Sequence, residues 1–147
     1  MKYIYQEELS NPKSFSGEKV LLVDDNKINL KVTKLLLEDS GVSVDAAMSG
    51  EEAVDMYRQS EQNYYRIIFM DINMYGMNGY DTTRLIRNMK REDSKSIPIF
   101  AMSADILEIH KERAKEAGMN GYVMKPFAFR EVFSLMHHVF GADKEEV

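Results

Sequence analysis

The chain has 147 residues, a net charge of −5 and no cysteine, a length that suits one domain with its own core. Its isoelectric point near 5.3 and the lack of any basic run exclude a nucleic-acid surface. The absence of cysteine excludes disulfides and thiolate metal sites, and it fits a reducing compartment. No apolar stretch approaches the roughly 20 residues that span a bilayer, so we expect a cytoplasmic domain that makes no membrane contact.

The two ends of the chain differ from its middle. Residues 1–17 contain no continuous apolar run and are expected to form a flexible lead-in or linker. The folded domain is predicted over residues 18–141, and residues 142–147 are expected to form a short tail. Gly141 stands where a C-terminal helix cap would be.

Short apolar runs alternate with segments of helical periodicity from Lys19 onward. Each run is bounded by polar or turn residues, and its continuity is typical of a strand that is buried on both faces. In chain order, the predicted strands are the segments KVLLVDD, VSVDAA, RIIFMD, IPIFAMS and GYVMKPF.

Five helices are predicted between and after these strands. Asn26 is a candidate N-cap for the first helix, and Ser49 with Glu52 forms a capping box for the second. The apolar residues that mark the helices, in chain order, are Ile28, Val32, Leu35 and Leu36; Ala53, Met56 and Tyr57; Leu85, Ile86 and Met89; Ile106, Leu107, Ile109 and Ala114; and Phe129, Val132, Phe133, Met136, Val139 and Phe140. Five strands that alternate with five helices predict an α/β fold, with a parallel sheet covered on both faces.

Polar side chains follow the predicted strands where each one ends. Asp24 and Asp25 follow the first strand, Asp71 ends the third, Ser103 the fourth, and Lys125 follows the fifth. Taken singly, each is explained as a turn former, a cap or a solvated charge. In a parallel sheet, however, these ends share one edge, and three close carboxylates stay ionised only beside a cation. Oxygen donors favour a hard ion, and Mg²⁺ fits best.

Four motifs together resemble the receiver domain of two-component response regulators. They are VLLVDDN, FMDINMYGMNGYD, AMSA and GYVMKPF, and the resemblance covers about residues 18–140. It implies a flavodoxin-like (βα)5 three-layer sandwich whose central parallel sheet has the strand order 2-1-3-4-5.

The resemblance implies a role for each acidic residue. Asp71 would be the phosphoacceptor, a carboxylate nucleophile that forms an acyl phosphate. Asp25, Asp71 and the backbone carbonyl of Asn73 would bind Mg²⁺ directly, and Asp24 would act through water. The domain would then catalyse its own phosphorylation and dephosphorylation.

The resemblance also assigns the remaining site residues. Lys125 would pair with the phosphoryl oxygens, and Ser103 would hydrogen-bond one of them after transfer. Tyr122 matches the switch aromatic, which turns inward when the hydroxyl residue moves. One position departs from the family pattern, because Tyr75 stands where proline is usual.

The implied partners are a histidine kinase or a histidine phosphotransfer protein, whereas the downstream protein partner is not identified by the sequence. The stretch DDNKINLKV resembles receivers attached to hybrid sensor histidine kinases. The alternative is that the domain is a stand-alone regulator. The surface around Tyr122 is expected to bind a partner or a second copy of the chain.

Three other functions fit these residues less well. A phosphorylation-independent interaction module on the same scaffold is the main alternative, although such domains usually lose the acidic or lysine residues that are kept here. A haloacid dehalogenase-like hydrolase would need an acid at position 73, which is Asn73. A nucleotide-binding protein would need a phosphate-binding glycine motif, and the sequence contains none.

Overall fold

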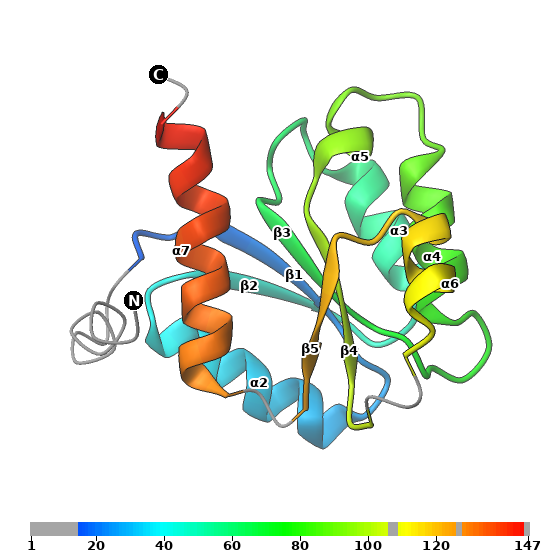
Figure 1. The fold of residues 1–147 in the computed structure, drawn as a ribbon, viewed down its shortest axis with the longest axis horizontal. Helices are drawn as coiled ribbons and strands as arrows, with labels where there is room; N and C mark the ends of the chain where they lie inside the picture. Colours follow the sequence, from blue (N-terminus) through cyan, green and yellow to red (C-terminus); the bar gives the residue numbers. More distant parts are fainter. Residues whose placement is uncertain (1–14, 106–108, 126–127, 146–147) are drawn as a thin grey trace.

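The computed structural model describes residues 15–105, 109–125 and 128–145, with the backbone alone at residues 129 and 142–145. Strands and helices alternate along it (Figure 1). The strands are β1 (Lys19–Val23), β2 (Ser43–Ala47), β3 (Ile67–Asp71), β4 (Ile99–Ser103) and β5 (Gly121–Met124). The helices are α2 (Lys27–Asp39), α3 (Gly50–Gln59), α4 (Gly79–Arg87), α5 (Asp93–Ser96), α6 (Lys111–Ala117) and α7 (Phe129–Glu145).

All five strands form one parallel sheet in the order β2-β1-β3-β4-β5. This confirms the predicted α/β class and the strand order 2-1-3-4-5. The strands also end close together, because Asp71 lies beside Met102 in the ladder and Ser103 lies beside Met124. The polar residues at the strand ends are therefore brought to one edge of the sheet.

The helices cover the two faces of the sheet as separate layers (Figure 1). Side chains of α3, α4 and α6 pack on one face, where Tyr57 and Ile86 are fully buried. Side chains of α2 and α7 pack on the other face, around Phe69 and Met136. Within the described part of the chain, no helix is long and apolar enough to cross a membrane.

Two predicted helix starts are confirmed by their hydrogen bonds. The side chain of Asn26 accepts the N–H of Asn29 at the start of α2. The Ser49 hydroxyl accepts the N–H of Glu52 at the start of α3. The Glu52 carboxylate accepts the N–H of Met48, one residue before the cap. The predicted capping box therefore forms, with Met48 in place of Ser49 as the backbone donor.

The structure corrects three details of the helix predictions. Gly141 does not end the last helix, because α7 continues to Glu145 through residues that favour helix. Ile109 precedes α6 instead of lying in it, and Ile106 and Leu107 fall outside the described residues. The short helix α5 was not predicted, since its sequence DSKS carries no apolar periodicity.

Helix α2 does not bury the apolar residues that marked it in the sequence. It packs on the sheet through Leu30 and Leu37. Ile28, Val32 and Leu35 are instead 75%, 50% and 61% exposed. Because these positions are spaced by four and three residues, they form one exposed row along the helix.

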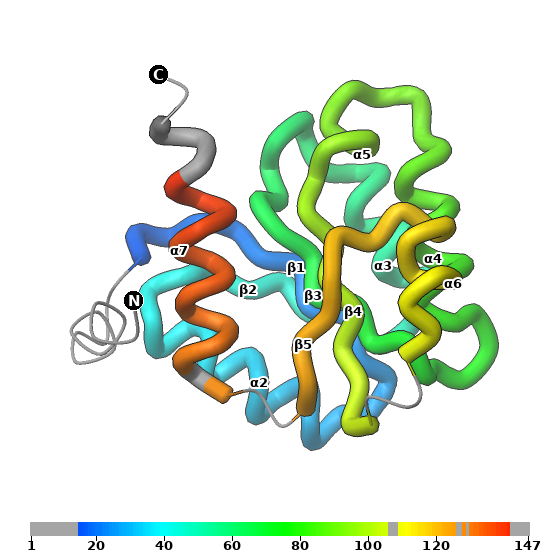
Figure 2. Tube along the Cα trace, viewed as in Figure 1, coloured from blue at the N-terminus to red at the C-terminus, as the bar shows by residue number. Residues whose placement is uncertain are grey.

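The last residues of the expected lead-in pack onto the domain. Phe15 is buried, and its ring makes edge contacts with Phe133 and Phe140 of α7. Its N–H donates to the carbonyl oxygen of Ser40, at 2.9 Å. Figure 2 shows the start of the described chain running beside α7. The prediction of a flexible linker is therefore wrong at residues 15–17. The burial of the large Phe15 side chain stabilises this segment by more free energy than its ordering costs. Residues 1–14 lie outside the described part of the chain.

Candidate acidic site at the edge of the sheet

Three carboxylates meet at the carboxyl edge of the sheet, as the sequence predicted. Asp24 and Asp25 follow β1, and Asp71 is the last residue of β3. Each offers an oxygen atom, and the three oxygens lie within 4.8 Å of one another. Asp24 and Asp71 are buried, whereas Asp25 is partly exposed. The cluster is thus shielded from solvent at Asp24 and Asp71 and accessible to it at Asp25.

Lys125 supplies the positive charge of this cluster. Its ammonium Nζ lies 2.9 Å from an oxygen of Asp24 and 3.4 Å from an oxygen of Asp71. The position of this residue is fixed through the backbone, because its N–H donates to the carbonyl oxygen of Ser103 at 2.7 Å. The lysine is therefore held at the tip of the neighbouring strand and reaches across to both acids.

The electrostatics of Asp71 reflect its burial. Desolvation raises the pKa of Asp71 to about 7, Lys125 opposes that rise, and the charge of Asp24 adds to it. Burial alone would lower the pKa of Lys125, but its hydrogen bond to Asp24 and the charge of Asp71 raise it above its ordinary value. Lys125 therefore stays charged, and the net charge of the four groups is negative when all the acids are ionised.

The loop after β3 wraps closely around Asp71. The N–H of Asn73 donates to an oxygen of Asp71 at 3.3 Å. Gly79 begins α4 directly against the strand end, and a Cβ atom there would collide with the backbone oxygen of Asp71. A residue with no side chain is needed at this position. The structure places Asn73 beside Asp71, whereas the ligand role of its carbonyl stays a prediction.

Ser103 and Tyr122 lie at neighbouring places on β4 and β5. Ser103 is buried, and its hydroxyl both donates to the carbonyl oxygen of Asp105 and accepts the N–H of that residue, at 2.9 and 3.2 Å. Tyr122 is half-buried, and the ammonium of Lys111 lies 5.6 Å from the centre of its ring. Ser103 thus lies at the end of β4 and Tyr122 lies beside Ala101 on the neighbouring strand β5, and their switch roles stay predictions.

Besides the N–H of Asn73, two further backbone contacts to the acids were not predicted. The N–H of Asn26 donates to one oxygen of Asp24 at 2.9 Å. The N–H of Tyr75 donates to Oδ2 of Asp25 at 2.7 Å. The sequence carries one signal for the second contact. Tyr75 has a backbone N–H at a position where the family usually has proline, which has none.

The donor set of this cluster fits a hard divalent cation. It consists of carboxylate oxygens from three residues within reach of one ion, with no nitrogen or sulfur donor in the group. Three ionised acids would carry more charge than the one ammonium of Lys125 balances, and the charge of Asp24 adds to the effect of burial on the pKa of Asp71. Asp24, Asp25 and Asp71 are the residues that could hold such an ion.

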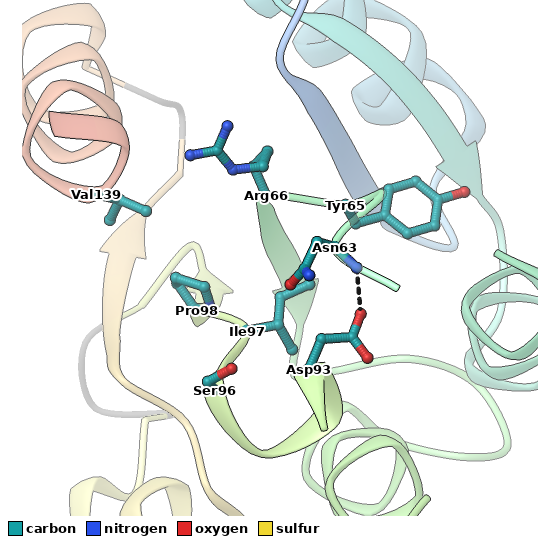
Figure 3. Close-up of a pocket in the computed structure, with 8 residues that line it drawn as sticks. All are labelled: Asn63, Tyr65, Arg66, Asp93, Ser96, Ile97, Pro98 and Val139. Carbon is teal, nitrogen blue, oxygen red and sulfur yellow. Dashed lines mark hydrogen bonds between the residues drawn. The ribbon is translucent and has the colours of Figure 1, made fainter. Parts of the chain in front are cut away.

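A hollow lies at the opposite end of the strands from the acidic site. It has a volume of about 420 Å³ and is lined by residues that precede β3 and β4, together with Val139 of α7 (Figure 3). Its buried acid, Asp93, accepts the N–H of Asn63 and pairs with Arg91. Burial alone would raise the pKa of this carboxyl, but the contacts with Arg91 and Asn63 together lower it below its ordinary value, so we assign Asp93 a structural role.

Sequence comparison places these residues in a known family. The family model for the response regulator receiver domain matches residues 20–137. Curated relatives include a probable histidine kinase 6 of Oryza sativa, 32% identical over 145 residues, and histidine kinase 3 of Arabidopsis thaliana, 32% identical over 147 residues. Each alignment covers 88% of this chain, but only 15% and 14% of the two relatives, so the chain spans a small part of their length.

Solved structures agree with this assignment. The receiver domain of a sensor histidine kinase from Pseudomonas aeruginosa, with a magnesium ion coordinated in its active-site cleft, is 32% identical with a TM-score of 0.76; the match covers 86% of this chain and 99% of that one. A chain from the co-crystal of a Saccharomyces cerevisiae histidine phosphotransfer protein with the receiver domain of its downstream response regulator is 26% identical with a TM-score of 0.72, covering 84% and 88%. With this fold and the acid and lysine residues at its sheet edge, the chain belongs to the response regulator receiver domains of two-component signalling.

Proposed function

We propose that Asp71 accepts a phosphoryl group from a phosphohistidine and so switches the surface of the domain. The observation that carries this proposal is the place of Asp71, buried at the tip of a central strand with the ammonium of Lys125 3.4 Å away and two further carboxylates at hand. A rigid strand end holds a nucleophile better than a mobile loop.

The transfer forms one bond and breaks another. An oxygen of the Asp71 carboxylate attacks phosphorus, and a P–O bond forms as the P–N bond to the donor histidine breaks. The leaving imidazole keeps the electron pair of that bond and takes up a proton from solvent. Lys125 is already charged and lies beside Asp71, so it would stabilise the negative charge that develops on the phosphoryl oxygens without a further proton shift.

Mg²⁺ is the cation that we propose for the acidic cluster. Asp25 and Asp71 would hold it, with the carbonyl of Asn73, and Asp24 would act through water. When bound, the ion supplies positive charge that keeps Asp71 ionised and neutralises the phosphoryl oxygens. The oxygen-only donor set supports this choice, as does the magnesium ion coordinated in the similar Pseudomonas aeruginosa receiver.

The switch would run through Ser103 and Tyr122. After phosphorylation, Ser103 would exchange its hydrogen bonds with Asp105 for one to the phosphoryl group, and the Tyr122 ring would turn into the space vacated. Tyr122 is half-buried, so its ring is not enclosed by the core in the unphosphorylated chain. The surface that changes would be the one around α6 and β5, and it would bind a downstream protein or a second copy of the chain.

The phosphoryl donor that we propose is a histidine kinase or a histidine phosphotransfer protein in the cytoplasm. The names of the relatives support a kinase context, and the yeast co-crystal joins a similar receiver to a phosphotransfer protein. The exposed row of Ile28, Val32 and Leu35 on α2 supports protein docking, because α2 starts just after Asp25 and any protein donor must cover this rim to reach Asp71.

The proposal is tested by intact-protein mass after incubation with acetyl phosphate, with and without Mg²⁺. The expected result is a gain of one phosphoryl group that requires Mg²⁺ and is absent in Asp71→Asn. Asp55→Asn, an exposed acid on α3, is the matched control and should gain the group like the native chain. If the native chain gains no mass and binds no beryllofluoride, the proposal is wrong and the interaction-module alternative takes its place.

A further inference from the structure

A hydrogen bond joins the loop after β3 to the loop after β1 across the acidic site. The N–H of Tyr75 donates to Oδ2 of Asp25 at 2.7 Å, although the two residues are 50 positions apart in the chain. Asp25 belongs to the three-carboxylate cluster. One of the proposed cation ligands is therefore held by the backbone of the loop that wraps around the phosphoacceptor.

The backbone of Tyr75 makes this contact, and its ring is not needed for it. The tyrosine side chain is 94% exposed, so packing of the ring does little to place the residue. Asp25 is partly exposed, and an unrestrained carboxylate at such a position can rotate toward water. The short N–H contact is what limits that rotation, and proline at residue 75 would remove the donor.

We propose that the Tyr75 N–H is a positioning group for the cation site, which orients Asp25 and links cation binding to the order of residues 72–78. Hydrogen bonds to a ligand from the next shell of atoms fix its orientation and raise the affinity for the ion. Each carboxylate oxygen has two lone pairs, so accepting this N–H leaves capacity for a cation. By thermodynamic linkage, an ion that favours the oriented Asp25 also favours the loop conformation that orients it.

This inference rests on the proposed Mg²⁺ site and is tested on the unphosphorylated chain. Mg²⁺ binding is measured by calorimetry for the native chain, Tyr75→Ala, Tyr75→Pro and a chain in which the α-hydroxy analogue of tyrosine replaces residue 75. The analogue keeps the ring and turns the donating N–H into an ester oxygen. We expect the dissociation constant of Tyr75→Ala to stay within about twofold of native, and those of the proline and ester chains to rise roughly tenfold, the low end for such contacts.

Hydrogen exchange at the amide of residue 75 gives a second readout that does not depend on affinity. In the native chain and in Tyr75→Ala, this amide should exchange slowly, and more slowly still once Mg²⁺ is added. Far-UV circular dichroism of the proline and ester chains checks that the fold is kept.

Two results would overturn the inference while leaving the phosphoacceptor role intact. One is an ester chain that binds Mg²⁺ as tightly as the native chain. The other is a residue 75 amide that exchanges at the rate of a free amide with and without the ion. Failure of the native chain to bind Mg²⁺ at all is a different outcome, because it would remove the proposed cation site together with this inference.

Discussion

When no cation is present, the surroundings of Asp71 favour the protonated form of its carboxyl group. Burial raises its pKa from an ordinary 3.8 to about 7, and the nearby Asp24 adds to the rise against the pull of Lys125. Between those two pH values the folded chain binds more protons than the unfolded chain. The free energy of unfolding therefore falls as pH rises through this window, and above pH 7 the whole penalty is present.

Replacing this carboxylate by an amide should remove that penalty. We expect metal-free Asp71→Asn to unfold at about the same temperature as the native chain near pH 4 and several degrees higher at pH 8, because a gain on the order of 1–3 kcal/mol corresponds to such a shift. Saturating Mg²⁺ should narrow the gap, since the ion stabilises the ionised native site. Calorimetric melting curves from pH 4 to 8 test this; equal melting temperatures at pH 8 would contradict it.

The matched control for this experiment is Asp55→Asn. Asp55 lies on α3 with its side chain 64% exposed, and it pairs with Arg58 on the same helix. Surface pairs of this kind contribute at most about 1 kcal/mol. The variant should therefore show a small loss with no growth between pH 4 and pH 8, which separates the effect of the buried site from a general effect of lost charge.

The strands and the residues at their tips were predictable because the signal is local. A continuous apolar run that stops at an acid or a hydroxyl, as at Asp71 and Ser103, gives both the strand and the edge on which the side chain lies. Tyr75 illustrates what was not predictable. Its backbone N–H contacts Asp25, fifty positions away in the chain. Every residue except proline has a backbone N–H, so the sequence does not show which of these groups will bond to a distant side chain.

Helix α2 shows a second limit of local patterns. It carries two sets of apolar residues, and periodicity alone does not tell which set faces the sheet. Tertiary packing selects Leu30 and Leu37 and leaves Val32 and Leu35 exposed. Phe15 was missed for the same reason, since an isolated aromatic residue in a polar segment has no period. Its burial depends on the position of α7, more than a hundred residues further along the chain.

The exposed row on α2 should matter for transfer between proteins and not for the chemistry at Asp71. We expect Val32→Glu to slow phosphotransfer from a phosphorylated histidine phosphotransfer protein by roughly tenfold, because a charge placed in an apolar contact weakens docking. A tenfold change corresponds to about 1.4 kcal/mol. Its rate of phosphorylation by acetyl phosphate should stay unchanged. Both rates are measured by the loss and gain of the phosphoryl group with time.

A helix on the other face of the sheet supplies the control for this substitution. Leu85 of α4 is 46% exposed, close to the 50% of Val32, and Leu85→Glu should leave both rates at the native value. Equal protein-to-protein rates for Val32→Glu and Leu85→Glu would show that α2 does not contact the donor. A loss of both reactions in Val32→Glu would instead point to a disturbed fold.

Phe15, the first residue that the structure describes, packs against the helices on one face of the sheet. Phe15 contacts α7 through Phe133, Phe140 and the ring of His137, whose centre lies 4.5 Å away, and its N–H satisfies the carbonyl of Ser40 at the end of α2. It thus joins the two helices that cover this face of the sheet. On this packing, the folded unit includes residue 15, three positions before the predicted start at 18.

Phe15→Ala should therefore destabilise the whole domain and not a loose end. Truncating a buried phenylalanine costs about 3 kcal/mol, which corresponds to a melting temperature roughly 6–12 °C lower for a chain of this size. Phe15→Leu, which keeps an apolar side chain in the same space, should lose less than half as much. Because the acidic site lies at the strand ends, acetyl phosphate should still modify folded Phe15→Ala at Asp71. A melting temperature within one or two degrees of native in Phe15→Ala would mean that the domain starts after this residue, and that α2 and α7 hold their places on the sheet without it.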